Sequence, residues 1–176
     1  MERRETLSLN EWAVLACLVE RPRHGYDIAA ELAPGAELGT VWRGARQPVY
    51  RALGRLDALG LAEPRHAEPG EGGPPRQVFG PTADGRQRLA RWVVRPVDHL
   101  RDVRGALLLK LVVARRLAID ATPLVEAQRD RFEHPLASLA APPAAGDAVA
   151  LWRHHSALAV RAFLNDLRAG GDAAQP

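Results

Sequence analysis

The side chains with the clearest potential chemistry in this sequence are a glutamine and two arginines spaced four residues apart, Gln47, Arg51 and Arg55. In a helix this interval places them along one side. A guanidinium group matches the O6 and N7 atoms of guanine with two hydrogen bonds, and a glutamine amide matches adenine in the same way. The three residues therefore predict a helix face that can enter the major groove of DNA, with Gln47 and Arg51 nearest the base edges.

The segment around these residues has the pattern of an amphipathic helix from Pro48 to Leu59. Proline suits a first turn, where its missing N–H would have no partner, and Gly60 provides a left-handed stop. One side of the segment is apolar, with Val49, Leu53 and Leu56. The opposite side is polar or small, with Gln47, Arg51, Gly54 and Ala58. We expect the first side to be buried and the second to face a partner.

Two short strands, 61–65 and 77–80, are predicted after this helix, around a glycine- and proline-rich loop at 69–75. A helix followed by such a hairpin is the order of a winged helix. Candidates for contact with DNA phosphates lie around the helix and at the base of the wing: Arg43, Arg46, Tyr50, Arg55, Arg65, His66 and Arg76. Glu68 and Glu71 make the tip of the wing a poorer candidate, because acids repel phosphates.

The formal charge of +3 is unevenly distributed along the 176 residues. Residues 1–40 hold four arginines and seven acids, whereas residues 41–95 hold ten arginines and five acids. Positive charge therefore gathers on the predicted helix and wing, where the release of counterions from phosphates would favour binding. The alternative is that these arginines only cover a solvated surface, and charge alone does not decide between the two.

Helices are also predicted on the N-terminal side of this face. Ser8 and Glu11 form a capping box before an apolar series, which predicts a helix over 9–20. A second helix is expected over 25–32. Trp42, in the connection that follows, is expected to pack in the core, because a lone large aromatic in a small domain usually does.

The segments after the wing also read as helices. Thr82 suits the N-cap of a helix that returns to the core. Residues 105–118 are apolar almost all round, which predicts burial on more than one side. Thr122 is expected to cap a further helix with Pro123 in its first turn, and Pro135 is expected to kink or end that helix.

The last predicted helix covers 147–168 and begins with Asp147 as its cap. Its apolar positions repeat at intervals of three and four: Val149, Trp152, Ser156, Ala159 and Phe163. Such a stripe predicts packing against a partner. Residues 169–171 are expected to end this helix and to lead into a disordered tail.

Three segments resemble, in order and spacing, the PadR family of bacterial transcription regulators: HGYDIAAEL, VYRALGRLDALGLAE and RQVFGPTADGRQRL. The residues that carry the resemblance are His24, Gly25, Tyr26, Tyr50, Leu53, Arg76, Thr82 and Gly85. It covers residues 7–92 most strongly, and RDVRGALLLKLVVARRL is similar to the family's C-terminal dimerisation region. The resemblance implies a dimeric winged helix-turn-helix repressor.

No pattern typical of catalysis, a metal site or a cofactor is found. Cys17 lies in an apolar run and is expected to be a buried thiol. Adjacent residues such as His154 and His155 point about 100° apart on a helix and make a poor chelating pair. The longest apolar run, 106–114, is broken by Lys110 and too short to cross a bilayer. We expect a cytoplasmic protein that is not an enzyme and binds no metal, cofactor or membrane.

The predicted fold is mainly α, with a winged helix-turn-helix domain over 1–95 that carries a small two-stranded β wing. A C-terminal helical dimerisation region over 96–176 follows it. The predicted function is sequence-specific binding of double-stranded DNA as a homodimer that represses from a near-palindromic operator. Trp92 and Trp152 suggest a further hypothesis, a cavity for a small apolar or aromatic effector that releases the DNA.

Two alternatives from other classes stay open at this point. In one, the winged helix is a protein interaction module whose arginines bind an acidic partner. In the other, the chain is a small enzyme or ligand-binding protein with an incidental basic face, which would need a set of polar residues in one pocket.

Overall fold

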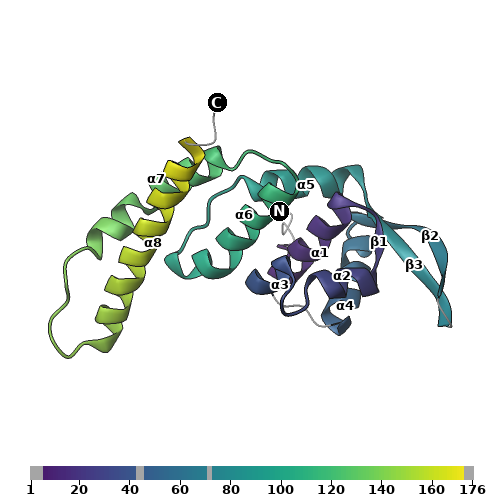
Figure 1. Cartoon of the computed structure of the whole chain (residues 1–176), viewed down its shortest axis with the longest axis horizontal. Coiled ribbons are helices and arrows are strands. Elements are labelled where there is room, and N and C mark those ends of the chain that lie inside the picture. The colour runs from purple at the N-terminus through teal and green to yellow at the C-terminus, as the bar shows by residue number, and fades with distance from the viewer. Residues whose placement is uncertain (1–5, 43–45, 71–72, 173–176) are drawn as a thin grey trace, which may run out of the picture.

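The computed structural model describes residues 6–42, 46–70 and 73–172. It is mainly helical, with a small antiparallel sheet at one end of the molecule and the last two helices side by side at the other (Figure 1). The elements in chain order are α1 Leu9–Glu20, β1 Arg23–His24, α2 Gly25–Glu31, α3 Glu37–Val41, α4 Arg46–Ala58, β2 Ala62–Gly70, β3 Gly73–Pro81, α5 Ala83–Val93, the 3-10 turn η1 Leu100–Asp102, the π-helical turn η2 Val103–Leu107, α6 Leu108–Arg116, α7 Thr122–Ser138 and α8 Ala148–Asp172. The predicted fold class is confirmed.

Helix α1 is the centre of the N-terminal core. It begins as predicted with a capping box, in which the Ser8 N–H donates to Glu11 Oε2 at 2.6 Å and the Glu11 N–H donates to Ser8 Oγ at 3.3 Å. Because α1 is covered on nearly every side, Ala13, Val14 and Leu15 have no exposed surface. Trp42 is partly buried against this core, in line with its predicted packing.

The sheet has three strands in the order β1–β3–β2, where the sequence predicted a two-stranded wing. The strands β2 and β3 also extend through most of the segment that was expected to be a loop, so that prediction was wrong. Proline is tolerated in β2 because it is an edge strand, and a register shift between Glu68 and Gly70 leaves Pro69 out of the regular ladder. The added strand β1 pairs Arg23 with Phe79 and His24 with Val78 on the other side of β3.

A second core lies around α7 and α8. Phe132 and Leu136 of α7 pack in it with Ala157 and Leu164 of α8. Pro135 lies inside α7, which continues to Ser138, so the helix does not end at this residue, which was one of the two expected outcomes. Buried side chains on both sides of the proline hold the helix in place. Thr122 is the first residue of α7 and not its cap.

Helix α8 begins as predicted, because the Ala150 N–H donates to Asp147 Oδ1 at 2.9 Å. It continues to Asp172, past the stop that was expected at 169–171, so that prediction was wrong. Glycine disfavours a helix by only about 1 kcal/mol per residue and does not by itself end one. The final residues of the tail, 173–176, lie outside the described residues.

Helix α6 connects the two cores. Its Leu109, Val113 and Ala114 are buried in the N-terminal core, whereas Leu111 packs against the second one. The predicted boundary between residues 95 and 96 assigns α6 to the C-terminal region. The helix nevertheless packs against the N-terminal region through three buried side chains.

Cys17 and His154, which were considered from the sequence as a buried thiol and as a metal ligand, are both buried. Cys17 lies in the N-terminal core, and burial raises the pKa of its thiol to about 12, which makes the thiolate scarce at neutral pH. His154 is buried between α7 and α8, where Nδ1 lies 2.8 Å from the carbonyl oxygen of Leu139. Within the described ranges, no three His, Cys, Asp or Glu residues are grouped as metal ligands would be. Over the same ranges, no helix is long and apolar enough to cross a membrane.

Candidate nucleic-acid interface

The face of α4 that points away from the core carries the side chains that were predicted from the sequence to contact DNA. Val49, Leu53 and Leu56 are at most 2% exposed on the inner side of the helix. Six exposed residues form what we call the outer face of α4, Gln47, Tyr50, Arg51, Gly54, Arg55 and Ala58, and Asp57 is also exposed on the flank beside Tyr50. The predicted division of this helix into a buried and an exposed side is therefore confirmed.

Helix α1 holds α4 in position from behind. Asn10 Nδ2 donates to the carbonyl oxygen of Pro48 at 3.0 Å, near the start of α4. Arg55 Nε lies 3.2 Å from Glu11 Oε1, in the same carboxylate that completes the capping box of α1. Arg55 therefore has a structural partner, and part of its charge is already balanced.

Helix α2 approaches the outer face at Tyr50. A Cβ atom on Gly25 would lie 2.7 Å from Tyr50 Cε1, so only glycine allows this approach without a shift of the ring. His24 caps α2, because its Nδ1 accepts the Asp27 N–H at 3.3 Å. Together α2 and α4 form the helix-turn-helix arrangement, and the ring of Tyr50 stays 55% exposed at its edge.

The basic residues of the wing all have partners nearby. Arg65 donates to the carbonyl oxygen of Pro81 at 3.1 Å and pairs with Glu63 at 3.0 Å. His66 lies 3.2 Å from the carboxylate of Glu68. These contacts hold both side chains along the hairpin, where a phosphate would have to compete with a carboxylate.

Arg76, on the other strand, lies over the ring of Tyr26, with its guanidinium carbon 5.2 Å from the ring centroid. The contact joins β3 to the N-terminal end of α2. Tyr26 is 44% exposed, so this pair lies at the surface between the wing and the helix-turn-helix. Arg43, together with the side chain of Arg46, lies outside the described part of the structure.

The two tryptophans that suggested an effector site are in different places. Trp92 stacks on Trp12 in the N-terminal core, with ring centroids 4.6 Å apart and planes 12° apart. Lys110 Nζ lies 4.1 Å from the centroid of the Trp92 ring and donates to its carbonyl oxygen. Trp152 is 74% exposed on α8. The structure does not bring Trp92 and Trp152 together within the chain.

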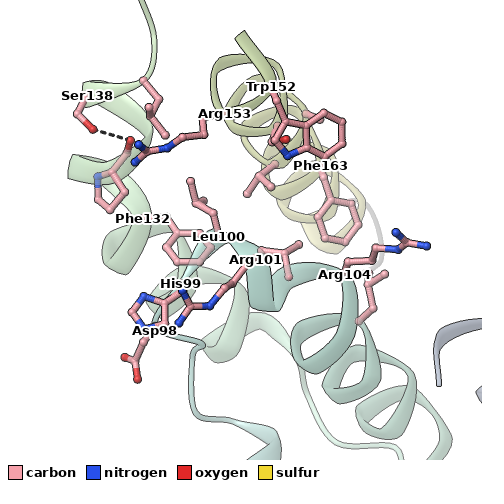
Figure 2. A pocket seen from close by; sticks show the side chains of 17 residues that line it. Asp98, His99, Leu100, Arg101, Arg104, Phe132, Ser138, Trp152, Arg153 and Phe163 are labelled. Atoms are coloured by element: carbon pink, nitrogen blue, oxygen red, sulfur yellow. Dashed lines mark hydrogen bonds between the residues drawn. The ribbon is translucent and has the colours of Figure 1, made fainter. Parts of the chain in front are cut away.

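A cavity of about 930 Å³ lies beside Trp152, between α7, α8 and the segment that leads into α6 (Figure 2). Its aromatic lining comes from Phe132 on α7 and from Trp152 and Phe163 on α8. Three arginines stand around it: Arg101, Arg104 and Arg153. The cavity is apolar in its lining and basic at its margin, and Trp92 is not part of it.

Several residues that shape the interface were not predicted from the sequence to contact the candidate DNA-binding residues. Asn10, Glu11 and Tyr26 each contact a candidate residue or its helix, but they lie far from it in the chain. Their own segments showed only the pattern of a helix and its cap. Only the polar character of Asn10 within a largely apolar helix could have indicated that it makes a hydrogen bond to another element.

Residues 14–91 match the family model described as the Transcriptional regulator PadR-like family. This segment of the chain is therefore similar to PadR-like regulators. The match contains the second part of α1 together with α2, α4 and the wing, which belong to the elements that build the outer face of α4 and its surroundings. The match ends within α5, so this similarity stops before the second core.

A probable transcriptional regulator of Mycobacterium tuberculosis is 28% identical over 96 residues, which are 54% of this chain and 49% of that protein. The chain thus matches about half the length of this relative. Among solved structures, Bacillus subtilis PadR in complex with operator DNA is 20% identical, with a TM-score of 0.49 over 93% of this chain and 99% of that one. The same protein in complex with p-coumaric acid has a TM-score of 0.42 at 20% identity, over 93% of this chain and 96% of that one.

Proposed function

We propose that this chain is a sequence-specific DNA-binding transcriptional regulator that acts as a homodimer on a near-palindromic operator. The observation that carries the proposal is the outer face of α4, where Gln47 and Arg51 are exposed while the opposite side of the same helix is buried. The PadR-like match over these elements supports it. Repression would follow where the operator overlaps a promoter.

The side chains of this face divide into two roles. Gln47 and Arg51 read base edges, since amide and guanidinium groups form paired hydrogen bonds with adenine and guanine. Tyr50 and Arg55 lie at the edges of the face and contact phosphates, which fix the register of the protein without reading sequence. Phosphate contacts are also assigned to Arg43, Arg46, Arg65, His66 and Arg76.

The homodimer is proposed to form through α8. The helix exposes four large hydrophobic side chains, Trp152 on the side opposite its buried residues and Val149, Leu151 and Leu158 on the two flanks, each at least 40% accessible. Such a run is unusual for a helix that faces only water. A second copy is the occupant that we favour, because a two-fold pair can place two α4 helices about 34–36 Å apart, one turn of DNA.

An effector site is a second proposal, supported by the cavity beside Trp152. Aromatic walls from Phe132 and Phe163 suit a flat apolar or aromatic molecule, and the arginines at the margin suit one that carries a negative charge. Binding would release the operator only if the molecule prefers the dimer that cannot hold DNA. A panel of small aromatic acids, titrated into the protein–operator complex, tests this idea, and failure of all of them to change operator affinity would count against it.

Selection of duplexes from a random DNA pool by the purified chain tests the main proposal. We expect enrichment of a motif with two related half-sites, and an affinity that falls steeply with salt because phosphate contacts release counterions. An alternative is a winged-helix module that binds an acidic protein. That alternative predicts no enriched motif and only weak affinity for any duplex, so such a result would contradict DNA recognition.

A further inference from the structure

Four charged side chains from four elements meet at the ends of α1, α2 and α6. Arg116, in the last turn of α6, donates from Nη2 to Glu20 Oε2 at 2.6 Å and from Nη1 to Glu31 Oε2 at 2.9 Å. Arg23, on β1, donates to the same two carboxylates at 2.6 and 3.2 Å. We call these four residues the Arg116 cluster. Each carboxylate in it accepts from both arginines.

The Arg116 cluster is largely withdrawn from water. The side chain of Arg23 is 1% exposed and that of Arg116 is 15% exposed. The hydrogen bond from Arg116 is the main cause that lowers the pKa of Glu20 below its ordinary value. The two arginines and two glutamates of the cluster balance in charge, and a further carboxylate, that of Glu37, lies 4.0 Å from Arg116 Nη1 at its margin. Removal of one arginine would leave two partly buried carboxylates with a single cation.

The position of Arg116 in the fold gives the cluster its significance. Helix α6 is buried in the N-terminal core through Leu109 and Val113, and it leads back through η2 to the second core, where Leu107 is buried. Glu20 ends α1 and Glu31 ends α2, and these two helices contact α4 through Asn10 and Gly25. The cluster therefore ties the helix that leads to the C-terminal region to the helices that hold α4.

We propose that Arg116 is a positioning residue for DNA recognition, which fixes the angle between α6 and the helix-turn-helix. This role rests on the proposed function, because the angle matters only if two subunits must place their α4 helices on one duplex. A guanidinium group reaches two carboxylates at once with a rigid planar fork, whereas apolar contacts along a helix tolerate small rotations. Arg116 thus sets the separation of the two outer faces without itself contacting DNA.

The role predicts that a variant without the guanidinium group keeps the fold and the reading of each half-site but loses its preference for one spacing. The chosen variant is Arg116→Gln, since the buried apolar side of α6 is unchanged. The matched control is Arg115→Gln, which removes the same charge from the adjacent position, where the side chain is 73% exposed and pairs with Glu37, a carboxylate that lies 4.0 Å from Arg116 Nη1 but outside the hydrogen bonds of the cluster. Glu31→Gln is a second test, because it weakens the hydrogen bonds from both arginines at one carboxylate.

The experiment uses the full chain and the duplex that the wild type selects from a random pool. Half-sites of that duplex are moved together or apart by single base pairs, and affinity is measured for each spacing and for an isolated half-site. We expect the wild type and Arg115→Gln to prefer one spacing about tenfold or more, and Arg116→Gln to bind all spacings within about threefold. Half-site affinity should be equal for all three, with unchanged circular dichroism and elution volume.

Each other outcome is decisive. If Arg116→Gln keeps the spacing preference of the wild type, the positioning role is wrong while the proposed function stands. If Arg115→Gln loses the preference to the same extent, general charge and not the cluster is responsible. If the wild type selects no duplex, the proposed function fails and the role fails with it. Should Arg116→Gln not fold, the same comparison made with Glu31→Gln decides between these results.

Discussion

Helices α4 and α8 are both amphipathic, but their exposed sides carry different kinds of side chain. Each buries one side against its own core, with Leu53 and Leu56 on α4 and Ala157 and Leu164 on α8. The exposed sides differ in chemistry: α4 presents mainly glutamine and arginine with one tyrosine, whereas α8 presents tryptophan, valine and leucine among its polar residues. The buried sides fix the fold, and the exposed sides show which partner each helix is suited to.

The difference has a physical cause. Exposed arginine and glutamine are well hydrated, so the outer face of α4 costs little in the absence of a partner. Exposed apolar surface costs about 25 cal/mol per Å², so covering Trp152 and its neighbours on α8 would be favourable by itself. From this contrast we expect α8 to be covered in the resting protein and α4 to be covered only when DNA is present.

The largest effect is expected from Trp152→Glu. A charge at this exposed apolar position should separate the two subunits, because an ionised carboxylate cannot be buried there without a partner. Operator affinity should then fall about a hundredfold or more, since each half-site would be bound separately. Light scattering after gel filtration gives the mass, and a binding titration gives the affinity.

Asn165→Glu, which places the same charge at an exposed polar position of α8, should remain dimeric. A dimeric Trp152→Glu would show that α8 is not the interface.

A smaller but more specific loss is expected from Arg51→Ala. Loss of a paired hydrogen bond to a base should cost about 1–3 kcal/mol in affinity for the selected operator and much less for random DNA. Arg168→Ala is the matched control, because it removes an exposed arginine from α8. Competition titrations with both DNAs measure the two losses. Equal losses on both DNAs would refute a base-reading role for Arg51.

The sequence predicted the elements whose signals are local. The capping box at Ser8 predicted where α1 begins, and the helical periodicity around Leu53 predicted which side of α4 is buried. Each of these signals depends on residues within one or two turns of the helix. The strand β1 was missed because two residues carry no pattern of their own. Arg23 and His24 form a strand only because β3 offers them an edge.

Features built from distant residues could not be predicted. Arg116 and its partners Glu20 and Glu31 are separated by 96 and 85 positions, and each reads in the sequence as an ordinary solvated charge. Trp92 was paired with Trp152 on aromatic character alone, yet its ring stacks on Trp12, a contact that depends on how α5 packs against α1. The residue types suggested that these side chains make important contacts, but the partners in those contacts depend on how the helices pack.

A pH effect is expected from Lys110, which lies on α6 between the two regions. Burial, with a contribution from Arg95, lowers the pKa of its ammonium group from 10.5 to about 7. The unfolded chain therefore binds more protons than the folded chain between these values, and stability should rise with pH across that window. Between pH 7 and 8 the gain is at most about 1 kcal/mol.

Urea unfolding at a series of pH values measures this gain. Lys110→Met keeps the length and burial of the side chain without the charge, so the rise should be smaller in this variant than in the wild type by the contribution of Lys110. Operator affinity at fixed pH should change little, because Lys110 lies on neither outer surface. Identical pH slopes for the two proteins would show that the amino group does not titrate in this range.

The smallest effect, and the sharpest test of the contrast between α4 and α8, is expected from Gly54→Ala. Gly54 lies in the middle of α4 on its outer face, and among the described residues nothing outside the backbone of α4 itself lies within 4 Å of a Cβ atom placed there. Alanine should therefore stabilise the fold by about 0.5–1 kcal/mol, because glycine disfavours a helix interior. The same methyl group should weaken operator binding severalfold if a duplex lies against this face. A gain in melting temperature without a loss of affinity would mean that Gly54 does not approach DNA, and that the outer face of α4 meets the duplex only through its longer side chains.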